Sequence, residues 1–124
     1  MQIKLGELDS ILISMQSILN KELPIKIAYK FSKLQKSLLE EYKIFQENKQ
    51  KLIDKYGEKD EEGNLIIKDD KIMILSQYLD AFNAEFSDFL EIEVEINFEP
   101  IKIEDLNIEI TPEVLMNLDK FIIE

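Results

Sequence analysis

The most concentrated set of potentially reactive side chains is a row of glutamates near residue 95. Acidic and apolar residues alternate in the stretch LEIEVEINFEP, residues 90–100, whose acids are Glu91, Glu93, Glu95 and Glu99. Two carboxylates can act as acid and base in glycoside hydrolysis when a cleft holds both against the substrate. Alternate residues of a strand, however, lie about 6.6 Å apart on one open face. We therefore expect no catalytic pair, and interpret the row as a solvated strand face or as part of a surface that recognises a basic partner.

A second acidic segment, residues 58–69, partly has the spacing of a calcium-binding loop. Glu58, Asp60 and Glu62 would occupy the first, third and fifth positions, Gly63 the sixth and Asp69 the last. Such a loop normally begins with Asp and ends with Glu, whose longer side chain binds the ion through both oxygens. Both ends depart from that pattern. A plain acidic turn is the main interpretation, and calcium binding is the alternative.

The composition excludes most other chemistry. The chain contains no histidine and no cysteine, which removes Ser-His-Asp and Cys-His catalysis, thiolate metal sites and most zinc sites. We therefore expect a protein that is not an enzyme and that has no cofactor. Its 124 residues, 45% of them hydrophobic, predict one domain that spans residues 1–124. No apolar run approaches the roughly 20 residues of a spanning helix, and the N-terminus lacks a signal-peptide pattern, so we expect a soluble, cytoplasmic protein with no membrane partner.

Charge is distributed unevenly along the chain. Residues 1–57 hold ten lysines against seven acidic residues, a net charge of +3, whereas residues 58–124 hold five lysines against nineteen acids, a net charge of −14. One strand face carries about half the charge density of a DNA strand, so imitation of nucleic acid would need several acidic segments side by side. The predicted partner-binding acidic surface comprises Glu91, Glu93, Glu95, Glu99, Glu104, Asp105 and Glu109, and Asp80, Glu85 and Asp88 could lie alongside it.

A possible basic patch lies in the first half of the chain. Lys26, Lys30 and Lys33 repeat at helical spacing, and no arginine accompanies them. Such a row is usually a solvated helix face and is a weak signal for nucleic acid, so we expect no direct nucleic-acid binding. The alternative is that the row receives the acidic half of a second copy in a homo-oligomer.

Apolar residues three and four apart predict two helices at the start of the chain. The first is expected over residues 7–20. The second begins near Pro24, which suits a first helical turn, and continues to Gly57, a length of about 30 residues or roughly 45 Å. A helix of that length exceeds what one small domain can cover. Part of it must project or pair with another chain.

The second half of the chain predicts a mixture of strands and helices. A short strand is expected at residues 65–67, a third helix after Asp69 and Asp70 as N-caps, and strands over residues 90–98 and 101–110. Thr111, Pro112 and Glu113 predict the start of a C-terminal helix whose buried face would hold Val114, Leu115, Leu118 and Phe121. The expected fold class is α+β: an N-terminal helical hairpin with a long second helix, then a small antiparallel sheet with a third helix and a short C-terminal helix.

Two stretches resemble a known group of proteins. They are LPIKIAYKFSKLQKSLLEEYKIFQENKQKLIDKYGEKDEEGN, residues 23–64, and ITPEVLMNLDKFI near the C-terminus. Both are similar to a family of small, functionally uncharacterised proteins that phages and prophages of low-GC bacteria encode. The resemblance carries no catalytic residues to transfer. It implies a phage-type protein that acts in the host cytoplasm.

Three functions fit this setting. The first is an acidic inhibitor, similar to anti-CRISPR proteins, that binds the basic surface of a host nucleic-acid-binding defence complex. The alternative is a virion or tail assembly factor, or a chaperone, that acts through helix-mediated self-association. The antitoxin of a toxin pair fits the same composition, but the sequence contains no DNA-binding element that we can identify.

Overall fold

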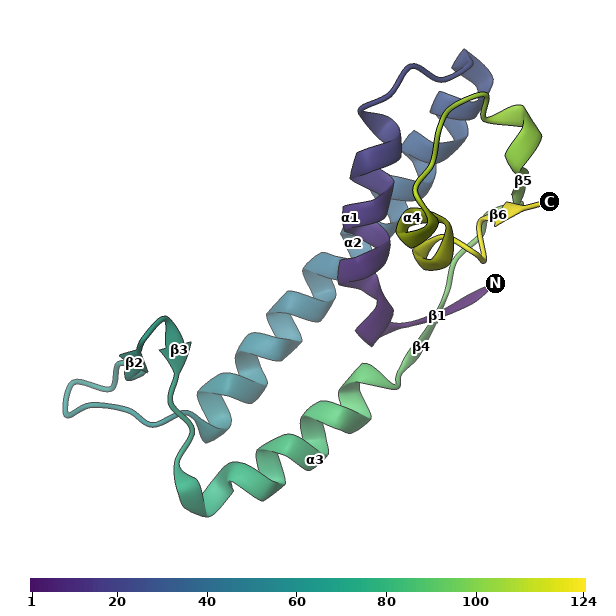
Figure 1. Ribbon diagram of the computed structural model, residues 1–124. Coiled ribbons are helices and arrows are strands. Elements are labelled where there is room, and N and C mark those ends of the chain that lie inside the picture. The colour runs from purple at the N-terminus through teal and green to yellow at the C-terminus, as the bar shows by residue number, and fades with distance from the viewer.

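The computed structural model describes residues 1–124 (Figure 1). It has two parts, one in which many segments pack around a core and one in which only a few pack together. The part that we call the body consists of residues 1–38 and 93–124, and it brings the two ends of the chain close together. The part that we call the arm consists of residues 39–92. It extends from the body as two helices joined by a small β-hairpin, which makes the molecule elongated.

Four α-helices form the frame of both parts, and their bounds are α1 (Leu8–Leu19), α2 (Ile25–Tyr56), α3 (Leu79–Leu90) and α4 (Pro112–Asn117). The first two confirm the predicted helical hairpin. Pro24 is the N-cap residue of α2, which has 32 residues, about 48 Å at a rise of 1.5 Å each. None of the four is both long enough and apolar enough to cross a membrane.

The hydrophobic core lies almost entirely in the body. The periodic apolar residues of α1 pack against the first half of α2, and apolar residues from both ends of the chain close the other sides. The sixteen residues of the core are Ile3, Leu5, Leu8, Ile11, Met15, Ile18, Phe31, Leu34, Leu38, Phe45, Ile96, Ile101, Leu106, Leu118, Phe121 and Ile122.

Six short strands form three separate pairs. Their bounds are β1 (Gln2–Lys4), β2 (Ile67–Lys68), β3 (Lys71–Ile72), β4 (Glu93–Glu95), β5 (Ile101–Lys102) and β6 (Ile122–Ile123). The pairs β1–β4 and β2–β3 are antiparallel, whereas β5–β6 is parallel. The α+β class with a long helix is confirmed, but the strands do not join into one sheet and not all pairs are antiparallel.

The predicted start of the third helix is wrong. Asp69 and Asp70 are not N-caps but the two-residue turn between β2 and β3, with φ angles of 52° and 62°. Two successive positive φ angles give the turn whose twist matches a hairpin, and Asp tolerates that conformation better than most residues. The α-helix begins only at Leu79, after a short 3-10 turn at Ser76–Tyr78.

The predicted strand over residues 90–98 is also too long at both ends. Leu90 closes α3, and Ile92 is 50% exposed. Only residues 93–95 form the ladder with β1, and one backbone hydrogen bond flanks it at each end, from the Leu5 amide to the Ile92 carbonyl at 2.9 Å and from the Ile96 amide to the Met1 carbonyl at 2.8 Å. The predicted alternation nevertheless continues in the burial pattern, since Ile96 is buried and Phe98 is half-buried between exposed neighbours.

The remaining predictions of the second half are partly correct. The strand expected at 65–67 is β2, shifted to Ile67–Lys68. The expected extended stretch 101–110 contains β5 and then a 3-10 turn at Ile103–Asp105. Thr111 caps α4 as predicted, and its hydroxyl accepts from the Val114 amide at 3.4 Å. The helix ends at Asn117, so the buried Leu118 and Phe121 lie beyond it, in the segment that leads to β6.

Candidate protein-binding site

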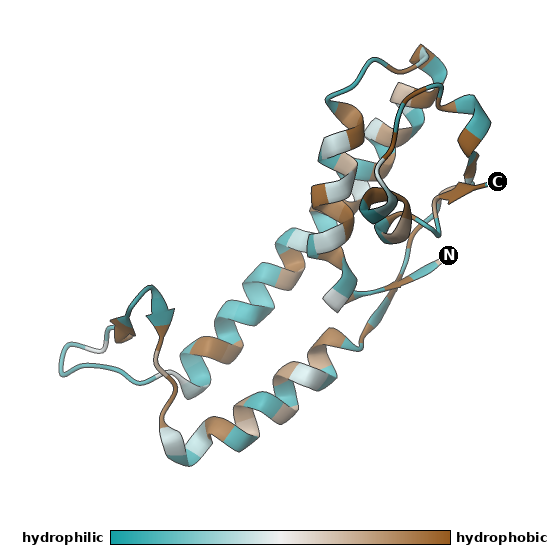
Figure 2. Cartoon of the chain, in the orientation of Figure 1, coloured by the Kyte–Doolittle hydropathy of each residue, from teal (hydrophilic) through white to brown (hydrophobic).

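The arm contains an aromatic row between its two helices. Phe45 of α2 stacks on Phe89 of α3 with ring centroids 5.0 Å apart, and Phe82 stacks on Phe86 at 5.7 Å. Tyr56, at the end of α2, meets the edge of Phe82 at 6.2 Å. Despite these contacts, α3 has no fully buried residue. Figure 2 shows hydrophobic residues along both arm helices, and each helix leaves part of its apolar side open.

An apolar cleft opens where the arm joins the body, and we call it the arm cleft. Its volume is about 470 Å³, and seven apolar residues line it: Leu5, Ile44, Phe45, Leu52, Phe89, Ile92 and Val94. Ile44 is 54% exposed and Ile92 50% exposed, so two large aliphatic side chains that line this cleft are open to solvent. Glu41, Asn48 and Glu85 provide the polar rim. A cleft of this composition is suited to an apolar side of another protein.

A charged latch ties the far end of α2 to α3. The Tyr56 hydroxyl donates to Oε1 of Glu85 at 2.6 Å, and Nζ of Lys55 donates to the same oxygen at 2.8 Å. These two donors, the lysine first, lower the pKa of Glu85, and the contact with Glu85 raises the pKa of Lys55. Because the side chains of Lys55 and Glu85 are exposed, water and salt weaken the ion pair between them. These contacts join the C-terminal end of α2 to α3.

The segment that resembles a calcium loop, residues 58–69, leads from the end of α2 into the β-hairpin at the end of the arm. Oδ1 of Asp60 accepts from the amides of Glu62 and Asn64 at 2.9 and 3.0 Å, which closes a tight turn. Gly63 has a φ of 83°, and Asp69 lies in a different turn, between β2 and β3. The acids therefore do not converge, and no group of three or more acidic side chains in the chain could hold a metal ion.

Three residues of the predicted acidic surface lie at the β1–β4 pair. Glu91 forms a salt bridge with Lys4 at 2.8 Å, and Glu95 forms one with the amino group of Met1 at 2.8 Å. Glu93 lies opposite Lys4 in the ladder. The hydrogen bond that Lys4 donates to Glu91, the charge of Glu91, and the charges of the nearby Glu7 and Glu93 raise the pKa of Lys4. Two positive groups, the amino group of Met1 and Lys4 of β1, thus face this part of the row.

The other predicted acids lie elsewhere on the body. Glu99, Glu104 and Asp105 share a hollow of about 270 Å³ with Lys30 and Lys102. The backbone carbonyl of Glu109 accepts from Nζ of Lys21, near the turn between α1 and α2. In Figure 1 this end of the body lies away from the β1–β4 pair. The predicted acidic residues therefore form two groups with lysines among them.

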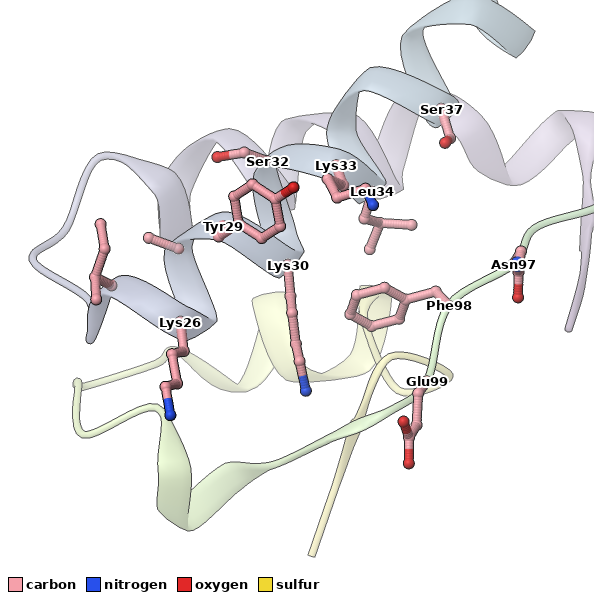
Figure 3. Close-up of a pocket in the computed structure, with 12 residues that line it drawn as sticks. Lys26, Tyr29, Lys30, Ser32, Lys33, Leu34, Ser37, Asn97, Phe98 and Glu99 are labelled. Atoms are coloured by element: carbon pink, nitrogen blue, oxygen red, sulfur yellow. The ribbon is translucent and has the colours of Figure 1, made fainter.

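The predicted basic patch does come together. Lys26, Lys30 and Lys33 line one side of a groove of about 930 Å³, with Phe98 and Glu99 on the other side (Figure 3). We call it the lysine groove. Twelve residues of α2 and of residues 97–99 line it, and the apolar ones include Tyr29 and Leu34.

Sequence reasoning missed the partners of several of these residues. It did not find β1, although Ile3 between two polar residues is a short alternating signal. It assigned Phe98 to a strand face but did not place it against α2, because that contact joins segments more than 60 residues apart. Lys55 and Tyr56 lie at the end of the predicted second helix, and nothing in the sequence pattern indicates that they contact Glu85.

Comparison with known proteins found no relative: no protein-family model matches the chain, and neither a curated protein nor a solved structure matches it.

Proposed function

We propose that the chain is a non-enzymatic assembly factor of phage type that works by association of its arm with the arm of a second copy. The observation that carries this proposal is the arm cleft, whose apolar lining includes two aliphatic side chains that are half exposed. The resemblance of residues 23–64 to small phage proteins supplies the setting, that of virion or tail assembly.

The two helices of the arm, α2 and α3, cannot fully cover each other's apolar sides. Four helices in a bundle can, because each helix then faces two neighbours across a shared core. Two arms related by a twofold axis would supply those four helices, and a closed twofold contact is the commonest way in which identical chains associate. The open sides of Ile44 and Leu79, 54% and 46% exposed, would be covered in such a bundle.

The charge of the arm predicts how salt affects this association. Residues 39–92 contain fourteen acidic residues and seven lysines, a net charge of −7, so two arms repel each other at low ionic strength. Salt screens that repulsion and leaves the apolar contact intact. We therefore expect self-association to strengthen between about 50 and 500 mM salt, the opposite of an association driven by charge attraction.

Sedimentation equilibrium over a range of concentrations tests the proposal. Ile44→Asp places a charge in the arm cleft and should weaken self-association by at least about tenfold, since burial of an unpaired carboxylate is costly. The matched control is Ile13→Asp, because Ile13 is 72% exposed on α1 of the body. A wild-type protein that stays monomeric at all concentrations, or equal effects of the two variants, would refute the proposal.

A second candidate function is the acidic inhibitor of a nucleic-acid-binding defence complex. It is favoured by the hairpin end of the arm, residues 58–71, which holds six acids and three lysines. None of these acids takes part in a salt bridge within the chain. Its test is whether the protein blocks nucleic-acid binding by a purified host CRISPR complex, and whether Glu61→Lys with Glu62→Lys abolishes the block. Unchanged nucleic-acid binding in the presence of the wild-type protein excludes it.

A further inference from the structure

The lysine groove on the body lies apart from the arm cleft and has two unlike walls. One wall is the first part of α2, and the other is residues 97–99, between β4 and β5. Figure 3 shows Lys26 and Lys30 extending from the helix along the groove, while the ring of Phe98 points from the opposite wall toward the helix.

The helix wall carries three lysines that are not paired with an acid of the chain. Lys26, Lys30 and Lys33 are all exposed, and none forms a salt bridge or a hydrogen bond within the chain. Nζ of Lys33 lies 5.6 Å from the ring centroid of Tyr29. The only acid among the residues that line the groove is Glu99, which leaves a net charge of +2 there. The adjoining hollow, which Lys30 and Glu99 also line, adds Lys102, Glu104 and Asp105, so the two together keep a net charge of +1. Negative charge on a ligand would meet an excess of positive charge here.

The opposite wall presents unpaired backbone groups. The amide of Ile96 donates to the carbonyl of Met1 at 2.8 Å, and the amide of Ile101 donates to the carbonyl of Phe121 at 2.9 Å. Between these two bonds, the backbone amides and carbonyls of residues 97–99 make no hydrogen bond within the chain. Such a free edge can accept an added strand, which is a common way to bind an extended peptide.

Phe98 supplies a fixed apolar platform between the two walls. Its ring stacks on Phe31 at a centroid distance of 5.9 Å and meets the edge of Phe121 at 5.7 Å. Phe31 and Phe121 are fully buried, so the core holds Phe98 in place. An apolar side chain of a ligand could rest on this ring with little further ordering of the protein.

The chain already pairs an acidic strand with a positive partner at another place. In the β1–β4 pair, Glu93 of β4 lies opposite Lys4, and Lys4 forms a salt bridge with Glu91, two residues before β4 begins. Carboxylates two residues apart in an extended chain are about 6.6 Å apart. That distance is close to the rise of about 6 Å between Lys26 and Lys30 on α2. The spacing of the lysines thus suits a ligand with the acid and apolar alternation that β4 itself has.

We propose that the lysine groove binds an extended segment of another protein in which acidic and apolar residues alternate. Its backbone pairs with residues 97–99, its apolar side chains rest on Phe98, and its carboxylates lie against Lys26, Lys30 and Lys33. This binding does not depend on arm association, because the two surfaces lie on different parts of the molecule.

Fluorescence anisotropy with a labelled synthetic peptide, acetylated and eight residues long with alternating Glu and Val, tests the proposal. We expect saturable binding to the wild-type protein, weakened at least about tenfold by Lys26→Glu with Lys30→Glu. The matched control is Lys36→Glu with Lys43→Glu, which changes two exposed lysines of α2 outside the groove and should bind within about twofold of wild type. Circular dichroism confirms that both variants fold.

A second peptide separates strand pairing from charge attraction. It has the same sequence with N-methylated valines, so it keeps all carboxylates but lacks half of the backbone donors. We expect it to bind at least about tenfold more weakly than the first peptide. Equal binding of the two peptides, equal effects of the two double variants, or no saturable binding would overturn the proposal. Loss of self-association in the variant Lys26→Glu with Lys30→Glu would also overturn the proposal, because a second copy of the chain would then be what binds in the lysine groove.

Discussion

The helices of the body and of the arm have apolar residues at the same spacing, yet the body buries much more of the apolar side of its helices than the arm does. Fifteen of the sixteen core residues belong to the body, where α1, α2, α4 and both chain ends surround one centre. In the arm only two helices face each other, and its two buried large side chains, Phe45 and Tyr56, keep 4% and 9% of their surface exposed. An amphipathic pattern therefore predicts a helix, but the number of neighbouring segments decides whether its apolar side is covered.

The largest expected difference between the two parts is in the free energy of unfolding that is lost when a phenylalanine of each part is replaced by alanine. Phe31→Ala removes a fully buried ring from the body, and we expect a loss of about 3–5 kcal/mol in the free energy of unfolding. Phe86→Ala removes a half-buried ring from the arm and should cost about 1 kcal/mol. Urea denaturation followed by circular dichroism measures both. Equal losses would mean that the arm is as tightly packed as the body.

The latch between α2 and α3 should matter to the arm alone. Glu85→Gln removes the charge that Lys55 and Tyr56 contact, so amide hydrogen exchange in α3 should become several-fold faster. Exchange in α1 should stay unchanged and serves as the internal control. Faster exchange throughout the chain would instead show that the arm and the body unfold as one unit.

The same latch should give the arm a pH dependence. The lowered pKa of Glu85 means that its contribution to stability is present at neutral pH and is lost as the pH falls through that value. The raised pKa of Lys55 means that its contribution is lost only as the pH rises through that value, in the strongly alkaline range. Exchange of α3 in the wild-type protein, corrected for the intrinsic rate, should therefore accelerate in acid. In Glu85→Gln this acceleration should be smaller, and identical profiles would contradict the role of the latch.

The smallest expected effect is at the end of the arm. Asp70 has a φ of 62°, which glycine adopts at lower cost, so Asp70→Gly should stabilise the hairpin by about 0.5 kcal/mol. The matched control is Asp80→Gly, which places glycine in the first turn of α3 and should destabilise the arm by up to about 1 kcal/mol. Native-state hydrogen exchange of the Met73 amide, which donates to the carbonyl of Ile66, reports the first change. Destabilisation by Asp70→Gly would show that the aspartate contributes more than its backbone strain costs.

The contrast between body and arm also explains what could be predicted from the sequence. The bounds of α1 and α2 follow from long runs of apolar residues three and four apart, closed by Pro24 and Gly57. The start of α3 could not be placed, because Asp69 and Asp70 suit either an N-cap or a hairpin turn, and only the pairing of Ile67 with Ile72 decides between them. The β1–β4 pair joins residues some 90 positions apart through strands of three residues, too short for a periodic signal.

For the candidate sites, the sequence was sufficient to predict which charged residues are exposed and which share a helix side, but not which residues contact them. The spacing of Lys26, Lys30 and Lys33 was sufficient to place them on one side of a helix, and they do line one groove. The acids could be predicted to be exposed, because period-two alternation leaves one side in water. That Lys4 lies against Glu91 depends on strand pairing across the whole chain, which no local pattern encodes.

Association of two arms can be measured most directly as a distance between chains. The protein has no cysteine, so Asn48→Cys, at the rim of the arm cleft, gives a single site for a spin label. Pulsed electron paramagnetic resonance should then show a distance of about 20–30 Å between labels, as expected across a four-helix bundle. A label at Met116→Cys, 75% exposed on the body, should give a longer distance or none in range. Absence of any distance at Asn48→Cys, at concentrations where sedimentation detects a dimer, would contradict the arm as the site of association.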